Sequence, residues 1–117
     1  MDNLGIEIGA TAAGVTVMKL TGPLTLKNLF EFQESARSTG QAPMVIDLGG
    51  VPYMDSAGLG AVLGIMASCE RTGRGFAIAG ICERVRTLFQ ITHVDMLIPA
   101  FETVAIASAQ FVKAANA

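Results

Sequence analysis

The first twenty residues contain two short runs in which apolar and polar positions alternate. Ile6-Glu7-Ile8 alternates strictly, and residues 15–20 are rich in β-branched side chains and partly alternating. A period of two is typical of a strand that buries one face. Residues 10–14 can turn between the two runs, so the sequence predicts a β-hairpin. Gly22-Pro23 then interrupts the chain.

A helical spacing of apolar residues follows this break. Thr25 is the expected N-cap of the helix and Gly40 its expected end. The apolar positions of this helix are Leu26, Leu29, Phe30 and Phe32. Residues 44–48 (Met-Val-Ile-Asp-Leu) are then almost continuously apolar, which predicts a strand covered on both faces.

The rest of the chain switches between helical and strand-like patterns. We expect a helix over 57–71, a strand over 76–79, a helix over 83–91, a short strand over 96–98 ended by Pro99, and a helix over 102–113. The positions expected to face the core on these helices are Leu59, Val62, Leu63, Met66 and Cys69, then Val85, Leu88 and Phe89, then Val104, Ala105, Ser108 and Val112.

The predicted order of elements is β-β-α-β-α-β-α-β-α. Strands that alternate with helices after an opening hairpin indicate an α/β fold with a mixed sheet and mainly parallel crossovers. The chain has 117 residues, so we expect a single domain over 1–117.

Composition narrows the classes of function. Hydrophobic residues make up 51% of the chain and charged residues 15%, which excludes a disordered chain and indicates that some apolar surface meets a partner. The net charge is −2, there is no basic tract and no tryptophan, and Tyr53 is the only tyrosine, so we expect no nucleic-acid partner. Cys69 and Cys82 form neither a disulfide framework nor a CxxC motif, and we expect both to be reduced core residues.

The sequence also bears on location. The N-terminal residues have no positive region followed by an apolar stretch, so we expect no signal peptide. The longest uncharged run lies between Asp55 and Glu70 and is shorter than the ~18 apolar residues that a spanning helix needs. We therefore expect a cytoplasmic protein that does not insert into a membrane.

Ser56 is the most informative residue for function, because it stands where the strand over 44–48 leads into the next helix. A serine at such a junction can cap the helix, attack a carbonyl or receive a phosphate. As a plain N-cap it stabilises a helix by about 1 kcal/mol. However, Gly58, Gly60 and Gly64 lie inside the same helix, and each destabilises it by about 1 kcal/mol relative to alanine. Their presence indicates a close backbone approach, either to the chain's own sheet or to another protein.

We do not expect catalysis or cofactor binding. A serine hydrolase would need His93 and Asp95 as partners of Ser56, and Met54 stands where the G-x-S-x-G elbow has a glycine. One histidine and two scattered cysteines give no zinc-ligand spacing. No phosphate-binding P-loop occurs, and the three glycines miss the G-x-G-x-x-G pattern by one position. We therefore expect no catalytic residue, no metal and no cofactor.

Phosphorylation of Ser56 would have clear physical consequences. Free N–H groups and the helix dipole stabilise an anion at a helix N-terminus. The phosphate would add a charge of about −1.5 to −2 beside Asp55, with no Lys or Arg nearby in the sequence. If this surface docks a protein, the added repulsion of several kcal/mol would weaken binding at least about tenfold.

Two segments resemble the signature of STAS domains, and especially bacterial anti-sigma factor antagonists. They are residues 45–48 continuing through Tyr53-Met54-Asp55-Ser56-Ala57-Gly58-Leu59-Gly60, and Val85-Arg86-Thr87-Leu88-Phe89. The resemblance implies a four- or five-stranded mixed sheet with helices largely on one side. It also implies partner switching: the antagonist binds an anti-sigma factor that is a serine kinase, the kinase phosphorylates the antagonist and releases it, and a phosphatase resets the cycle.

Carried over to this chain, the resemblance makes Ser56 the phospho-acceptor. The implied partner-binding residues are Asp55, Ser56, Ala57, Gly58, Leu59, Gly60, Leu63 and Thr25. The family often has Gly-x-[LI]-Asp where this chain has Gly22-Pro23-Leu24-Thr25, so a carboxylate expected near the phospho-acceptor is missing. The alternative is a non-switching STAS scaffold or accessory subunit of a signalling or lipid-transport complex. Whether the chain forms a homodimer stays open.

Overall fold

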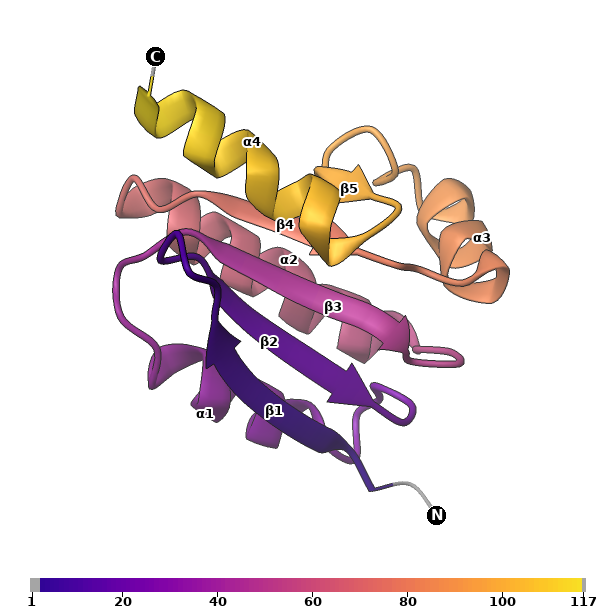
Figure 1. Ribbon diagram of the computed structural model, residues 1–117. Coiled ribbons are helices and arrows are strands. Elements are labelled where there is room, and N and C mark those ends of the chain that lie inside the picture. Colours follow the sequence, from indigo (N-terminus) through magenta and orange to yellow (C-terminus); the bar gives the residue numbers. More distant parts are fainter. Residues whose placement is uncertain (1–2, 117) are drawn as a thin grey trace.

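The computed structural model describes residues 3–116 and shows a five-stranded sheet with helices on both faces (Figure 1). The strands are β1 (Gly5–Ala10), β2 (Thr16–Thr21), β3 (Met44–Gly50), β4 (Phe76–Ala79) and β5 (Ala100–Phe101), in that spatial order. The helices are α1 (Leu29–Arg37), α2 (Ser56–Arg71), α3 (Glu83–Ile91) and α4 (Val104–Asn116). Only β1 runs antiparallel to its neighbour, so the predicted hairpin, element order and mixed sheet are confirmed.

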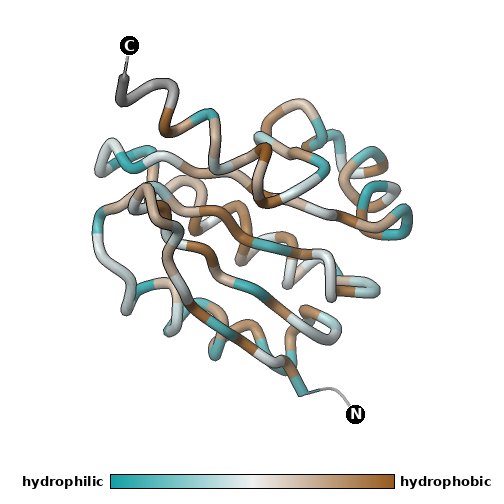
Figure 2. Tube along the Cα trace, viewed as in Figure 1, coloured by the Kyte–Doolittle hydropathy of each residue, from teal (hydrophilic) through white to brown (hydrophobic). Residues whose placement is uncertain are grey.

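The position of β3 in the middle of the sheet explains its continuous apolar run. Along β3, Met44, Ile46 and Leu48 enter the main core, whereas Val45 faces a second, smaller core with Ala107 of α4. Helices α1 and α2 cover the first face together, and α4 lies against the opposite face (Figure 1). Apolar residues accordingly concentrate along the middle strands and the helix sides that face them (Figure 2). Most helical mass lies on one side of the sheet, as expected.

The predicted core faces of α2 and α3 are confirmed. Leu59, Val62 and Cys69 of α2 are buried in the main core, and Leu63 and Met66 are packed against it. On α3, Val85 and Phe89 are buried and Leu88 packs beside them.

The start of α1 differs from the prediction. The helix begins at Leu29 with Asn28 in the N-cap position, so Thr25 is not its N-cap. Residues 23–28 form a separate turn, in which Asn28 Oδ1 accepts a hydrogen bond from Thr25 N–H at 3.0 Å and Asn28 Nδ2 donates to Pro23 O at 2.8 Å. Such local side-chain bonds compete with the helix. Leu26 lies on this turn and is 64% exposed, and Phe30 lies on α1 but is 71% exposed, so two of the four expected apolar positions are not buried.

The last strand and the last helix also depart from the pattern. Residues 96–98 form a turn rather than a strand, and β5 follows at Ala100–Phe101. Pro99 precedes this strand instead of ending it, because its carbonyl oxygen can still accept a hydrogen bond from Ile78 N–H at 2.9 Å. On α4, the buried face is formed by Ala107 and Ser108 with Val104 and Phe111 beside them, and Ala105 is exposed.

Candidate functional site

Asp55, not Ser56, caps α2. Asp55 Oδ1 accepts a hydrogen bond from the backbone N–H of Gly58 at 2.8 Å, which is the bond an N-cap side chain makes. Ser56 is the first residue of the helix, and its side chain is exposed. No hydrogen bond to the Ser56 hydroxyl is found within residues 3–116. The N-cap interpretation of Ser56 is therefore wrong, and the hydroxyl is left free for another role.

The same carboxylate holds a distant loop in place. Asp55 Oδ2 accepts a hydrogen bond from Leu26 N–H at 3.1 Å, and Asp55 N–H donates to Leu24 O at 3.3 Å. Leu24 also pairs with Met54 in an isolated parallel bridge. The turn that carries Thr25 is thereby fixed against the first turn of α2, so Thr25 and Asp55 lie beside one another.

Gly58 accounts for part of the glycine pattern. A Cβ atom at this position would lie 2.2 Å from the carbonyl oxygen of Leu24, which no side chain tolerates. The close approach is thus to the chain's own loop. Added Cβ atoms at Gly60 and Gly64 would meet nothing within 4 Å, so packing does not require glycine there.

The surface next to Ser56 contains a shallow hollow of about 310 Å³. It is lined by Thr25, Leu26, Lys27, Tyr53 and Asp55. Gly60 is exposed one turn after Ser56 on α2, and residues four apart share a helix face. We call the set Thr25, Leu26, Phe30, Asp55, Ser56 and Gly60 the Ser56 surface; Thr25 is half-buried and the others are exposed. Of the other candidate residues, Ala57 and Leu63 are half-buried, whereas Gly58 and Leu59 are buried and support this surface from below.

Basic residues near the site were missed by the sequence analysis. Lys27 lines the same hollow, and the Arg84 guanidinium lies 4.9 Å from the centre of the Tyr53 ring. A cation over an aromatic ring at an exposed site contributes about 0.5–1 kcal/mol. Both cations are far from Ser56 in the sequence, so only the fold brings them near. The one available signal was Tyr53 itself, an isolated aromatic residue three positions before the serine.

The remaining chemical candidates do not assemble into a site. His93 is exposed just beyond α3 with a φ of 60°, and no hydrogen bond joins it to Ser56. Cys69 is buried and Cys82 partly buried, and both are free thiols. Burial raises the pKa of the Cys69 thiol, and the nearby Arg74 charge opposes this in part. In the described part of the chain, no three His, Cys, Asp or Glu residues gather as metal ligands would.

Within residues 3–116, no helix combines the length and the apolar character that crossing a bilayer requires.

Comparisons with known proteins agree with this geometry. Residues 10–107 match the model of the STAS domain. An anti-sigma-B factor antagonist of Staphylococcus epidermidis is 32% identical over 93 residues, which cover 77% of this chain and 85% of the relative. The structure of an anti-sigma factor antagonist from Mycobacterium paratuberculosis superimposes with a TM-score of 0.81 at 18% identity, covering 93% of this chain and 94% of that one.

A second solved structure also shares the fold. The anti-sigma factor antagonist SpoIIAA in its unphosphorylated form superimposes with a TM-score of 0.76 at 18% identity, covering 93% of this chain and 97% of that chain. The same Bacillus protein has also been solved in its phosphorylated form. At this identity the likeness establishes the fold alone, and the match over residues 10–107 establishes the family. The chain belongs to the STAS domain family.

Proposed function

We propose that this protein is an anti-sigma factor antagonist that binds an anti-sigma factor with serine kinase activity and is released when that kinase phosphorylates Ser56. The names of its curated relatives support the antagonist role. The observation that carries the switch is the exposed Ser56 hydroxyl at the first position of α2. Because Asp55 performs the capping, phosphorylation of Ser56 would remove no hydrogen bond that the fold needs.

The N-terminus of α2 suits a phosphate. The first backbone N–H groups of a helix have no partner within the helix, and the helix dipole favours negative charge there. Asp55 occupies the N–H of Gly58 with its side chain. A phosphate on Ser56 would therefore add negative charge to a position that the helix tolerates, so the domain should stay folded after modification.

Partner release follows from the surroundings of the phosphate. The Ser56 surface carries exposed apolar side chains, Leu26 and Phe30, and one carboxylate, that of Asp55. A docked partner would remove water from this surface, and a second negative group beside Asp55 would then be repelled at a cost of several kcal/mol. Attraction to Lys27 in the same hollow offsets this only slightly, because an exposed ion pair contributes about 0–1 kcal/mol.

The direct test uses the purified chain, its cognate kinase and ATP. Mass spectrometry should locate the added phosphate on Ser56, and the Ser56→Ala variant should bind the kinase without being released. Ser56→Asp should weaken binding at least about tenfold, if repulsion causes the release. Ser38→Ala and Ser38→Asp are matched controls, because Ser38 is an exposed serine just beyond α1 and outside the Ser56 surface. Phosphate found only elsewhere, or equal affinities of Ser56→Ala and Ser56→Asp, contradicts the proposal.

The alternative, a non-switching STAS subunit, is supported by the absence of the carboxylate that the family often has at the position of Thr25. Thr25 lies beside Asp55 and accepts the N–H of Lys27 at 3.3 Å instead of supplying a negative charge. If the chain is an accessory STAS subunit, it should form a complex that ATP does not dissociate. If the complex recovered from cells contains a phosphatase and a kinase and dissociates when ATP is added, the switching antagonist is supported.

A further inference from the structure

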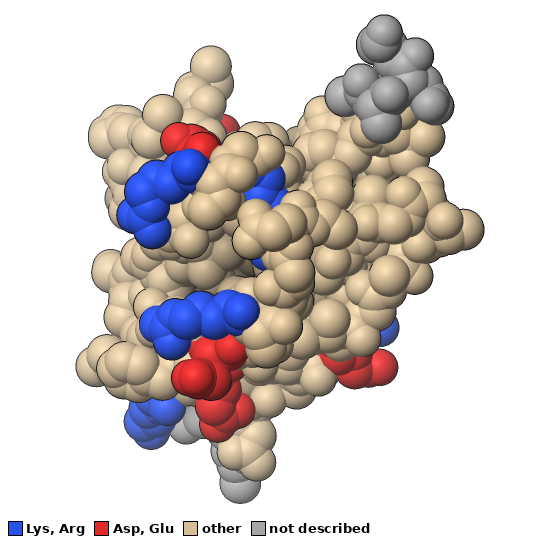
Figure 3. Space-filling model, turned by 90° about the vertical axis from the view of Figure 1, so that its left-hand side faces the viewer, with Lys and Arg blue, Asp and Glu red and all other residues tan. Residues whose placement is uncertain are grey.

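A second hollow lies between α1 and α2, at the opposite end of α2 from Ser56. Its volume is about 270 Å³. Helix α2 has 16 residues and is therefore about 24 Å long, so this hollow is remote from the Ser56 surface. Figure 3 shows this side of the molecule, with basic side chains above and below a depression.

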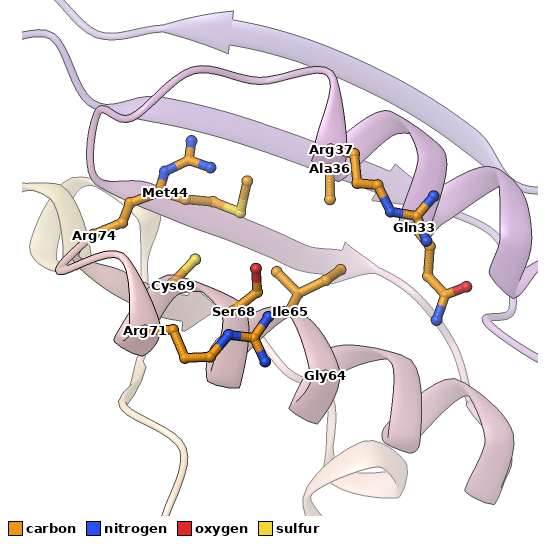
Figure 4. A pocket seen from close by; sticks show the side chains of 10 residues that line it. All are labelled: Gln33, Ala36, Arg37, Met44, Gly64, Ile65, Ser68, Cys69, Arg71 and Arg74. Atoms are coloured by element: carbon orange, nitrogen blue, oxygen red, sulfur yellow. The ribbon is translucent and has the colours of Figure 1, made fainter.

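The hollow concentrates the positive charge of an acidic protein. Arg37, Arg71 and Arg74 line it, which is three of the eight basic residues in a chain of net charge −2. In the part of the chain that the structure describes, no Asp or Glu lines it. The arginines come from three separate elements: Arg37 ends α1, Arg71 ends α2, and Arg74 stands in the loop before β4 (Figure 4). We call this hollow the arginine pocket.

Arg74 is held in place but not fully satisfied. Its Nε donates to Ala42 O, and its Nη1 donates to Thr39 Oγ1 at 3.0 Å. Its Nη2 is buried and has no hydrogen-bond partner among residues 3–116. Buried polar groups in folded proteins are nearly always paired, and an unpaired charged donor is especially unfavourable. A fixed guanidinium with an unused donor is a preorganised contact for an anionic group.

The simpler explanation, that arginines at helix ends serve the helices, does not cover the observations. The last carbonyl groups of α1 and α2 already accept hydrogen bonds from hydroxyl groups. Ser38 donates to Ser35 O at 2.6 Å, and Thr39 donates to Ala36 O at 2.7 Å. Thr72 donates to Ser68 O and Cys69 O, each at 3.3 Å. Arg37 has one exposed contact with Glu34 at 3.7 Å, which contributes little.

The lining also indicates the kind of ligand. Ile65 is half-buried and provides apolar surface, with the buried side chains of Met44 and Cys69 behind it, and the neutral polar residues Gln33 and Ser68 also line the pocket (Figure 4). Guanidinium groups match the oxygens of phosphate and carboxylate with paired hydrogen bonds, and several of them together favour a dianion. We propose that the arginine pocket binds a small phosphate monoester, with its phosphate on the arginines and a short apolar group against Ile65.

Phenyl phosphate, inorganic phosphate and benzoate are suitable probes. They should be titrated at constant ionic strength and pH 7.5, where a phosphate monoester is mostly dianionic. Phenyl phosphate should give saturable shifts of the amide resonances of Ser68, Arg71 and Arg74, with inorganic phosphate weaker and benzoate weakest. Inorganic phosphate binding as tightly as phenyl phosphate overturns the apolar part of the proposal. Benzoate binding as tightly as phenyl phosphate overturns the phosphate assignment, and the absence of saturable shifts overturns the site.

Two variants make the test specific. Arg71→Gln should lower the affinity for phenyl phosphate about tenfold, through loss of a charged hydrogen bond. Gly64→Leu should block binding sterically, since Gly64 lines the pocket and a side chain there meets no obstacle. Arg74 is avoided because it holds the loop of Thr39 and Ala42.

The controls are Arg86→Gln, an exposed arginine on α3, and Ala67→Leu, an exposed residue of α2 outside the pocket. Both should bind phenyl phosphate as the unmodified protein does. If Arg86→Gln weakens binding as much as Arg71→Gln does, the attraction is general electrostatics and the proposal fails. Ser56 takes no part in this experiment, so its outcome is independent of the proposed phosphorylation switch.

Discussion

Asp55 and Leu26 are joined by a hydrogen bond of 3.1 Å between the carboxylate and a backbone N–H, although 29 positions separate them in the chain. With its other oxygen Asp55 caps α2. One side chain therefore fixes both the start of the helix and the turn that carries Thr25 and Leu26. Leu26 is thereby held beside the residue that precedes Ser56, and both Leu26 and Ser56 are exposed.

Replacing Asp55 should destabilise the protein. Asp55→Ala removes the N-cap and the bond to Leu26, and we expect the free energy of unfolding to fall by about 2 kcal/mol. Asp55→Asn keeps only one acceptor oxygen and places an amide N–H2 group against the second backbone donor, so it is expected to lose about half as much or more. Urea denaturation measures both values. A loss of under about 0.5 kcal/mol for Asp55→Ala would mean that neither bond matters for stability.

Gly58 and Gly60 form a matched pair on one helix. Alanine is favoured over glycine by about 1 kcal/mol in a helix interior, so Gly60→Ala should stabilise the protein by up to that amount. Gly58→Ala should destabilise it by about 1–3 kcal/mol, because the new Cβ would lie 2.2 Å from Leu24 O. Thermal or urea unfolding of the two variants gives the comparison. Stabilisation by both substitutions would contradict the close approach seen at Gly58.

Phe30 should contribute to partner binding more than to stability. Its side chain is 71% exposed beside the Ser56 surface residue Leu26, so truncation removes little buried area. We expect Phe30→Ala to leave the urea midpoint nearly unchanged and to weaken binding of the anti-sigma factor by about 1–2 kcal/mol, or roughly tenfold. Calorimetric titration measures the affinity.

Ile91→Ala is the matched control for Phe30→Ala, because Ile91 is 69% exposed at the end of α3. The control should bind as the unmodified protein does. Equal weakening by the two substitutions would show that the docking surface extends well beyond the residues around Ser56.

The two cysteines should differ in reactivity. Burial raises the pKa of the Cys69 thiol, with Arg74 opposing the shift, and the side chain is only 4% exposed. The thiolate is the reactive form, so iodoacetamide at pH 8 should label Cys82 well before Cys69. Peptide mapping over time measures the labelling rate of each cysteine. Faster labelling of Cys69 would show that the region around the arginine pocket opens in solution.

The raised pKa also predicts a pH dependence of stability. The folded protein retains the Cys69 proton at pH values where the unfolded chain has lost it. The free energy of unfolding should therefore be unaffected near neutral pH and should fall as the pH rises above the pKa of an unfolded cysteine. Cys69→Ala should remove this part of the alkaline decline. A decline that is identical in Cys69→Ala would assign the effect to other groups.

The hydrophobic pattern by itself determined most of the fold. Three patterns indicate which faces are buried, because burial of apolar area dominates folding. They are the alternation of the first strands, the continuous apolar run of Met44–Leu48 and the helical stripe through Leu59 and Val62. The same reading located the Ser56 junction. It failed at Leu26, Met96 and Leu97, which lie on turns and are exposed, and at Phe30, which lies on α1 but is also exposed.

The tertiary structure decided what the sequence left open. Serine and aspartate are both good N-caps, so only the geometry shows that Asp55 caps the helix and leaves Ser56 free. Only the packing of Leu24 against Gly58 shows which glycine is required. Arg37, Arg71 and Arg74 look scattered in the chain, because contacts between residues on separate elements depend on how the elements pack. The sequence thus determined most of the elements and their buried faces, and the tertiary structure decided which polar groups are left available for binding and modification.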